Sequence, residues 1–286
     1  MNALTADRAM HWNIGRVSVD VIRDGLFAID GGAMFGVVPK VLWERVCRPD
    51  ERNRVTLTCN CLLLRTDERV MLVETGLGDK LDEKKRDIYA REGLTFLVDG
   101  LEVLGVSRFD VDTVILTHLH FDHAGGCTRR GDSGLEPVFP NARHVIQRGE
   151  WDDSLSEPHA HVTYPRENLD PLLDADLIDF VDGDETVAEG VRVFVTGAHT
   201  RRHQGVLVES DGESLLVLGD ICPLTAHLRL PYIAAFDRFP SEVYRVKEAL
   251  LGEAAASGAL VHFMHDTEVP ISRVRPAEGG FEPVSP

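Results

Sequence analysis

The sequence predicts an α/β fold built as one domain over residues 1–286. Its 286 residues are 43% hydrophobic, enough for one large and well-buried core. Short apolar runs typical of buried strands alternate with segments of helical periodicity. Residues with metal-binding side chains follow several of these runs between His118 and His265. They must meet in one place to act together, so no linker is expected to separate them into two domains.

Nine strands and three helices are expected from the apolar runs and the helical spacing. The strands are expected at Val17 to Ile22, Leu57 to Leu64, Val70 to Glu74, Thr113 to Thr117, His144 to Gln147, Val191 to Thr196, Val206 to Glu209, Ser214 to Leu218 and Leu260 to Met264. The helices are expected at Asp82 to Arg91, Leu97 to Leu104 and Ser241 to Ala256. Residues 152–172 hold three prolines among many charges, and this pattern predicts irregular surface structure.

Two terminal segments are expected outside the main body of the domain. Residues 1–16 are expected to form an N-terminal arm, and residues 267–286 a C-terminal tail that frays around 275–280. Residues 1–8 lack the basic and apolar regions of a signal peptide, and no apolar run approaches ~18 residues. We therefore expect a cytoplasmic protein without a membrane partner.

Charge and cysteine content argue against a nucleic-acid-binding protein and against a disulfide or cysteine-zinc framework. The formal net charge is −17, with 30 Lys and Arg against 47 Asp and Glu, and such a surface repels phosphate backbones. We therefore expect no nucleic-acid partner. The five cysteines show neither disulfide nor zinc spacing, and we expect Cys59 and Cys61 to be small core residues on one strand.

Residues 117–126 read Thr-His-Leu-His-Phe-Asp-His-Ala-Gly-Gly and directly follow the apolar run Val114-Ile115-Leu116. This segment holds His118, His120, Asp122 and His123. Neutral imidazoles and carboxylates at this density are the ligands that divalent metals select. A strand that ends here would place His118 and His120 on one side, and the following loop can turn Asp122 and His123 toward a second ion.

Three more candidate ligands follow apolar strands in the same way. His199 follows the run Val191 to Val195, Asp220 follows Leu215 to Leu218, and His265 follows Leu260 to Met264. Loops that leave the ends of neighbouring strands can converge. The pattern therefore predicts one metal site assembled from four segments.

In the order and spacing of these ligands, the chain from about Asn60 to Asp266 resembles the metallo-β-lactamase fold superfamily. The resemblance is to its two-metal branch, with the N-acyl homoserine lactone lactonases, methyl parathion hydrolase and glyoxalase II. It implies a four-layer αβ/βα sandwich, with the site between two sheets flanked by helices. His118, His120 and His199 would hold one ion, Asp122, His123 and His265 the other, and Asp220 would bridge them. A carboxylate rather than a thiolate at position 220 points away from the true β-lactamases.

The resemblance also implies the chemistry. Two divalent ions would share a hydroxide that attacks an ester-type bond, with Asp122 or Asp220 as the proton carrier. Zinc is expected because the ligands are rich in nitrogen, with manganese, cobalt and iron as alternatives. Related lactonases are often dimers, so the N-terminal arm suggests a homodimer.

Further residues are assigned around the ions. Glu74 stands where the family has an aspartate, and with His203 it is expected to support the ligands without binding metal. Apolar loops are expected to rim a cleft for a small apolar ester or lactone substrate. The predicted substrate contacts are Met34, Phe35, Phe121, His227, Tyr232 and Phe236.

Opening of a lactone is the predicted reaction, and three alternatives stay open. Some lactonases carry a tyrosine three residues after the bridging aspartate, where this chain has Pro223. Hydrolysis of a phosphotriester or aryl ester is one alternative. A glyoxalase II-like thioesterase is another, with Arg201 and Arg202 available to grip an acidic substrate. The last is a mononuclear iron oxidoreductase similar to the persulfide dioxygenases.

Overall fold

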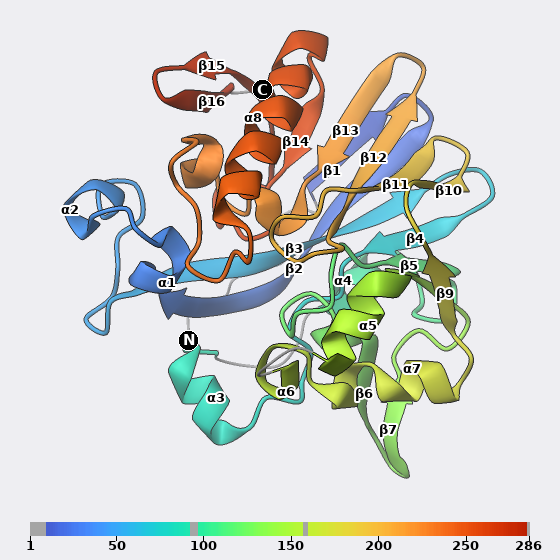
Figure 1. The fold of residues 1–286 in the computed structure, drawn as a ribbon. Coiled ribbons are helices and arrows are strands. Elements are labelled where there is room, and N and C mark those ends of the chain that lie inside the picture. Colours follow the sequence, from blue (N-terminus) through green and yellow to red (C-terminus); the bar gives the residue numbers. More distant parts are fainter. Residues whose placement is uncertain (1–9, 92–96, 157–159, 285–286) are drawn as a thin grey trace.

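Two seven-stranded sheets form the centre of the molecule (Figure 1). The computed structural model describes residues 10–91, 97–156 and 160–284. In sheet order, the first sheet contains β1 (Met10–Ile14), β2 (Val17–Asp30), β3 (Arg54–Arg65), β4 (Val70–Val73), β5 (Thr113–Ile115), β8 (Arg143–Gln147) and β9 (Ile178–Val181). The second contains β10 (Glu185–Ala188), β11 (Val191–Val195), β12 (Gln204–Ser210), β13 (Glu213–Val217), β14 (Leu260–His262), β15 (Ile271–Ala277) and β16 (Gly280–Val284). A separate hairpin joins β6 (Thr128–Gly131) to β7 (Gly134–Pro137).

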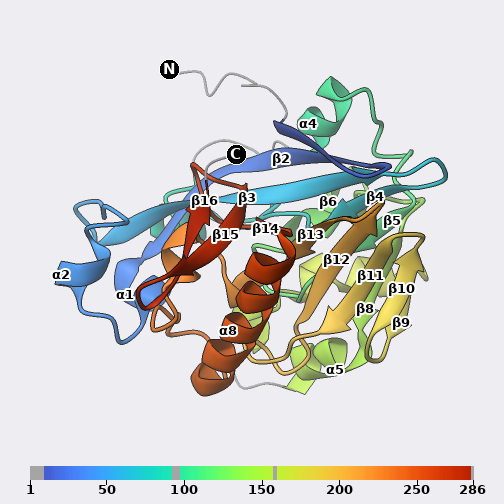
Figure 2. The ribbon, with the colours of Figure 1, turned by 90° about the horizontal axis from the view of Figure 1, so that it is seen from above.

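Helices cover the outer face of each sheet. The α-helices are α1 (Gly31–Phe35), α2 (Lys40–Trp43), α3 (Glu83–Ile88), α4 (Leu97–Val103), α5 (Arg148–Ser156), α6 (Ala160–Thr163), α7 (Asp170–Asp174) and α8 (Pro240–Ser257). The short 3-10 helices are η1 (Gly125–Cys127), η2 (Arg166–Asn168), η3 (Gly219–Ile221) and η4 (Thr225–Leu228). Figure 2 shows α8 beside the second sheet and the C-terminal hairpin β15–β16.

The alternation of side chains along the strands explains the layers. Leu62 and Leu64 of β3 pack with Leu215 and Val217 of β13 in the core between the two sheets. Leu63, between the first two, points to the opposite face and belongs to the core under the first sheet's helices. Successive residues of a strand face opposite sides, so strands that are apolar on both faces require two covered faces. The resulting order is helices, sheet, sheet, helices, which confirms the predicted four-layer αβ/βα sandwich.

A third core lies between α8 and the second sheet. Val243 and Leu251 of α8 pack with Leu216 of β13 and Val261 of β14. The helix begins with Pro240, whose fixed backbone suits a first turn, and ends at Gly258, which adopts the left-handed conformation.

Parallel strand pairs determine where the loops meet. β5 lies between β4 and β8 and is parallel to both, while β13 and β14 form the parallel pair of the second sheet. Parallel neighbours end at the same edge of a sheet, so the loops that follow them emerge side by side. The segments after β4, β5, β11, β13 and β14 carry the predicted metal ligands and the two residues, Glu74 and His203, that are predicted to support them.

Each of the nine expected strands overlaps an observed strand, and the three expected helices correspond to α3, α4 and α8. Two local predictions are wrong. Residues 152–172 are not irregular, because α5, α6, η2 and α7 form most of this segment. Pro165 precedes η2, and Pro171 sits in the first turn of α7, where a missing backbone N–H is tolerated.

The second error concerns the C-terminal tail. Residues 275–280 do not fray, because they join β15 and β16 in an antiparallel hairpin that extends the second sheet. Gly279 forms the turn with a φ of 77°. In the N-terminal arm, Met10–Ile14 pairs with β2, and the rest of the arm before residue 10 lies outside the described residues. Among the described helices, none is long and apolar enough to cross a membrane.

Candidate metal centre

The predicted ligands converge at the edge of the sandwich from both sheets. His118, His120, Asp122 and His123 follow β5 of the first sheet. The other three come from the second sheet, in the segments after β11, β13 and β14, and are His199, Asp220 and His265. Side chains that are far apart in the sequence thus form three groups of candidate ligands: two clusters, and a third group of His118, His123 and Asp220 that connects them.

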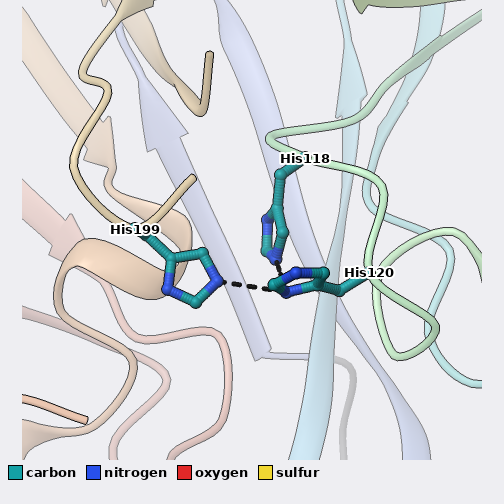
Figure 3. Close-up of side chains that lie close together, drawn as sticks. All are labelled: His118, His120 and His199. Atoms are coloured by element: carbon teal, nitrogen blue, oxygen red, sulfur yellow. Dashed lines mark hydrogen bonds between the residues drawn. The ribbon is translucent and has the colours of Figure 1, made fainter. Parts of the chain in front are cut away.

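The first cluster, defined here as His118, His120 and His199, consists of three imidazoles (Figure 3). His120 Nδ1 lies 2.9 Å from His118 Nε2 and 3.1 Å from His199 Nε2. His118 and His199 are buried, whereas His120 is partly exposed. Three nitrogens therefore point at one position that can be reached from the side of His120.

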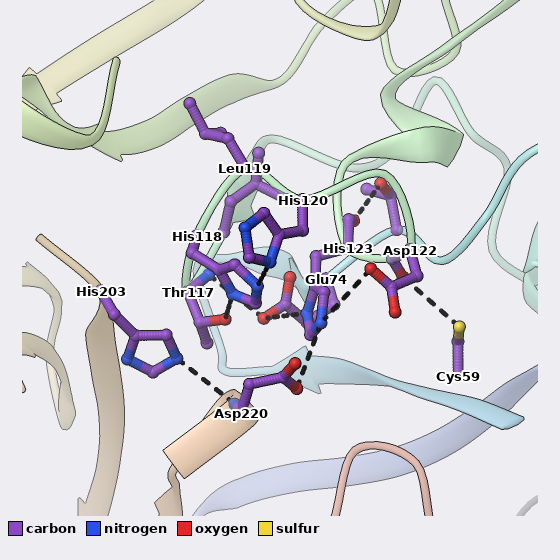
Figure 4. A network of polar contacts seen from close by, with 12 residues as sticks. Cys59, Glu74, Thr117, His118, Leu119, His120, Asp122, His123, His203 and Asp220 are labelled. Carbon is purple, nitrogen blue, oxygen red and sulfur yellow. Dashed lines mark hydrogen bonds and ion pairs between the residues drawn. The ribbon is translucent and has the colours of Figure 1, made fainter. Parts of the chain in front are cut away.

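The second cluster, defined here as Asp122, His123 and His265, combines two imidazoles with a carboxylate. His265 Nε2 lies 3.3 Å from His123 Nε2 and 3.7 Å from Asp122 Oδ2. A backbone contact holds the loop, since Cys59 Sγ donates to the carbonyl of Asp122 at 3.4 Å. Figure 4 shows Asp122 and His123 of this cluster from close by, together with Cys59 and Asp220.

Asp220 lies between the two clusters. Its Oδ1 is 3.3 Å from His123 Nε2 and 3.2 Å from His265 Nε2 in the second cluster. Its Oδ2 is 3.6 Å from His199 Nε2 in the first. One carboxylate therefore presents a different oxygen to each group of imidazoles.

The donor set fits divalent metal ions. Tetrahedral coordination with Zn–N bonds of 2.0–2.1 Å places ligand nitrogens ~3.3 Å apart, close to the separations within both clusters. Asp220 Oδ1 is buried and forms no hydrogen bond in the structure, although two imidazole nitrogens surround it. Buried carboxylate oxygens without hydrogen bonds are rare in proteins, and a cation between these atoms would compensate the charge.

The electrostatic environment differs between the clusters. Burial lowers the pKa of His118 and His120 well below the ordinary histidine value, and neighbouring imidazoles lower it further. For His265, burial acts in the same direction, but Asp220 outweighs it and raises the pKa to about 10. Against burial, Asp220 likewise raises the pKa of His123 well above its usual range. Positive charge, whether a proton or a metal ion, is thus favoured in the second cluster.

The outer nitrogens of the ligand imidazoles have fixed partners. His199 Nδ1 lies 2.7 Å from Asp237 Oδ1, and His265 Nδ1 donates to the carbonyl of Thr58 at 2.8 Å. Such contacts fix the ring orientation and leave Nε2 free to face an ion. Asp237 itself is anchored, because its Oδ2 accepts a hydrogen bond from the backbone N–H of Ala234 at 2.9 Å.

Glu74 reaches the ligand loop despite its additional methylene. Its Oε1 lies 3.3 Å from His123 Nδ1 and accepts the backbone N–H of Thr117 at 3.1 Å. Glu74 is fully buried and has a φ of 68°, a left-handed conformation that is uncommon for a residue other than glycine. Glu74 lies within ion-pair distance of His123 without a hydrogen bond between them, and its role in orienting this ligand stays a prediction.

The ring nitrogens of His203 contact the backbone of a ligand and a threonine, while its ring lies 5.1 Å from that of His118. Its Nε2 accepts the N–H of Asp220 at 3.4 Å, and its Nδ1 lies 2.6 Å from Thr196 Oγ1. Gly219 makes this approach possible, because a Cβ there would lie 2.6 Å from His203 Nε2 and 2.7 Å from Thr117 Oγ1. These contacts support the prediction that His203 helps to position the site without binding metal.

Two of the predicted substrate contacts lie beside the ligands. Phe121 is partly exposed and stacks on Tyr89 with ring centroids 4.9 Å apart. Phe236 is also partly exposed, and its ring meets that of His199 edge-on at 5.8 Å. Both rings are available to a substrate, and their roles stay predictions.

The other four predicted contacts pack together in a buried cluster. Phe35 stacks on His227 at 5.2 Å and meets Tyr232 edge-on at 5.8 Å, while His227 Nε2 donates to the carbonyl of Met34 at 3.0 Å. These side chains are at most 7% exposed. The structure gives them a packing role, and contact with substrate is an untested prediction for all four.

Sequence reasoning missed two buried acids that support the ligands. They are Asp237, next to Phe236, and Glu150, in the first turn of α5. Neither belongs to a motif, and each is one acid among many in its part of the chain. The only available signal for Asp237 was its place in an apolar segment, where an isolated charge needs a partner.

The fold and the clusters define a metal-binding protein whose site lies at the edge of an αββα sandwich. The model of the metallo-beta-lactamase superfamily matches residues 54–265, and the chain belongs to this superfamily. The chain is 29% identical over 231 residues to an N-acyl homoserine lactonase of Bacillus cereus, a match that covers 76% of this chain and 84% of the relative. A probable metallo-hydrolase of Mycobacterium tuberculosis is 25% identical over 234 residues, a match that covers 70% of this chain and 72% of the relative.

Solved structures of other proteins have a similar fold. A probable metal-dependent hydrolase from Staphylococcus aureus has a TM-score of 0.86 and 29% identity, with 92% of this chain and 94% of that chain covered. AidC, a dizinc quorum-quenching lactonase in complex with a product, has a TM-score of 0.80 with 97% of each chain covered. At 20% identity, this second likeness concerns the fold alone. Together the comparisons and the ligand clusters support a metal-dependent hydrolase.

Proposed function

We propose that the protein is a dinuclear metal hydrolase that opens an ester-type bond, most readily that of a lactone. The observation that carries the proposal is the position of Asp220, whose two oxygens face the two clusters separately. A mononuclear iron oxygenase would need the ligands of one ion only, typically two imidazoles and one carboxylate. The complete second cluster therefore favours two ions, with zinc as the expected metal.

When bound, two such ions supply Lewis acidity, which activates water and polarises a substrate carbonyl. The protein's own part is to hold the ligands in place and to exclude most of the solvent. An oxygen of Asp220 and one of Asp122 lie 3.2 Å and 3.7 Å from His265 Nε2, and each residue is 6% exposed, so both carboxylates are among the candidate ligands and mostly shielded from water. Either can accept a proton and pass it to the leaving alkoxide of an opened ring.

The surroundings of the clusters favour a small apolar substrate. His120 and Phe121 are the partly exposed members of the ligand motif, so a substrate is expected to approach from their side. Phe121 and Phe236 place aromatic rings along this approach, and such rings suit an acyl or aryl group. Relatives at 28–29% identity are named N-acyl homoserine lactonases, which agrees with this substrate class.

The arginines that would favour an acidic thioester are partly engaged elsewhere. Arg201 Nε lies 3.9 Å from Asp153 Oδ2, and its guanidinium lies over the ring of Phe239. Arg202 Nη1 lies 3.7 Å from Asp182 Oδ1. We therefore place thioesters below lactones among the expected substrates.

A substrate panel on the zinc-loaded enzyme tests the proposal. It would compare N-acyl homoserine lactones, aryl esters, a phosphotriester, a glutathione thioester and a β-lactam at equal concentration. We expect lactones to have the highest kcat/KM, aryl esters to follow and the β-lactam to be poor. A dominant thioesterase rate that falls in Arg201→Ala and Arg202→Ala would refute the lactonase proposal and leave the metal chemistry intact.

A further inference from the structure

Glu150 is a buried carboxylate, and both of its oxygens hold a ligand-bearing loop. It lies in the first turn of α5 and is 1% exposed. Its Oε1 accepts the backbone N–H of Leu119 at 3.2 Å, and its Oε2 accepts the hydroxyl of Thr200 at 2.6 Å.

These two contacts reach every segment that forms the first cluster. Leu119 stands between His118 and His120 in the loop after β5 of the first sheet. Thr200 directly follows His199 in the loop after β11 of the second sheet. A single side chain therefore connects the loops that supply all three imidazoles, although they are about 80 positions apart in the sequence.

We propose that Glu150 is a positioning residue that sets the distance between the two loops of the first cluster and so determines its affinity for an ion. The inference rests on the proposed metal centre. The inference goes beyond that centre in one respect. It makes Glu150, which contacts none of the three imidazoles, responsible for the distance between His199 and the pair His118 and His120.

The energetics of burial support this role. A buried carboxylate is costly unless hydrogen bonds compensate it, and burial raises the pKa of Glu150. An apolar residue would fill the same space without that cost, but it could not accept hydrogen bonds from Leu119 and Thr200. The position of these two donors therefore explains why a carboxylate fits here.

Three variants separate positioning from simple stabilisation. Glu150→Ala removes both contacts. Glu150→Gln keeps the shape, because its carbonyl can accept from Leu119 and its amide can donate to the Thr200 hydroxyl. Thr200→Val removes one contact and leaves the other. Asp152→Ala, on the exposed side of the same helix, is the matched control.

The experiment titrates zinc into each metal-free variant against a competing chelator, which resolves a stronger and a weaker site. We expect Glu150→Ala to weaken one site by roughly 10- to 100-fold, as for residues that orient ligands, with the second site little changed. Thr200→Val should weaken the same site less. Glu150→Gln and Asp152→Ala should bind two ions with nearly wild-type affinity.

Hydrogen exchange supplies a readout independent of metal. The amide of Leu119 should be protected in wild type and in Glu150→Gln, and should exchange faster in Glu150→Ala. If Glu150 were only a structural brace, Glu150→Ala would lower the melting temperature while both zinc affinities of the folded protein stayed unchanged. That result would overturn the proposal, as would a Gln variant as defective as the Ala variant. Neither measurement uses a substrate, so the outcome is independent of whether lactones are hydrolysed.

Discussion

The two ligand clusters differ in charge more than in shape. The first contains only imidazoles: Asp220 Oδ2 lies 3.6 Å from His199 Nε2, and Asp237 Oδ1 lies 2.7 Å from the outer nitrogen of the same ring. The second contains Asp122, receives Asp220 Oδ1, and has Glu74 behind His123. In the absence of ions, the second cluster therefore attracts protons, whereas two of the three imidazoles in the first resist them. The comparison teaches that the clusters should hold their ions with different strength and different sensitivity to acid.

The largest effect is expected for Asp220→Asn, which removes the one charge that the clusters share. Both ions should bind more weakly together, and turnover should fall by at least about 100-fold, because each ion loses an anionic ligand. Elemental analysis after gel filtration measures the ions, and initial rates measure turnover. Asp211→Asn, in the exposed turn between β12 and β13, is the control. Loss of only one ion from Asp220→Asn would show that Asp220 does not bridge.

A smaller and more selective effect is expected for His199→Ala. This change should empty the first cluster and leave about one ion per chain, because two imidazoles alone make an incomplete site. His203→Ala is the matched comparison, since both ring nitrogens of His203 contact groups other than the candidate ligand atoms, namely the N–H of Asp220 and the Thr196 hydroxyl, and the change should leave about two ions in place. Equal loss of metal from the two variants would mean that the ligand assignment is wrong.

The smallest expected effect is a difference in how strongly the metal affinity of each cluster depends on pH. An ion must displace protons from His123 and His265, whose pKa values are raised, but only from His199 in the first cluster. Below these raised pKa values, affinity should fall by about tenfold per pH unit for each displaced proton. Lowering the pH from 7 to 6 should therefore weaken the second cluster more than the first. Chelator titrations at both pH values would measure this, and equal slopes would contradict it.

The ligands could be predicted from the sequence because their signal is local. His118, His120, Asp122 and His123 lie within six positions after an apolar strand, and His199, Asp220 and His265 each follow another. The period-2 pattern of strands and the convergence of parallel strand ends then place them together without knowledge of tertiary contacts. The layer order was implied by the resemblance to the metallo-β-lactamase fold, and strands such as β3 that are apolar on both faces agree with it.

Unlike Glu74 and His203, Glu150 could not be predicted as a supporting residue, because its signal exists only in three dimensions. Glu150 lies in a charged segment and looks like a solvated acid, and its burial depends on how α5 packs at the end of β8. The same segment was expected to be irregular because of its prolines. In the structure, η2 begins directly after Pro165, and Pro171 lies in the first turn of α7. Composition alone does not show where a proline falls relative to the start of a helix.

The chain divides at the loop between β9 and β10, and each part builds one sheet. The part ending at Val181 carries four of the seven predicted ligands, and the part beginning at Glu185 carries His199, Asp220 and His265. Neither part has a complete cluster, because each cluster takes one imidazole, His199 or His265, from the second part. An ion bound at either position would therefore tie the two parts together as a cross-link does. In this respect the two sheets depend on each other like the subunits of an obligate dimer whose active site lies at the interface.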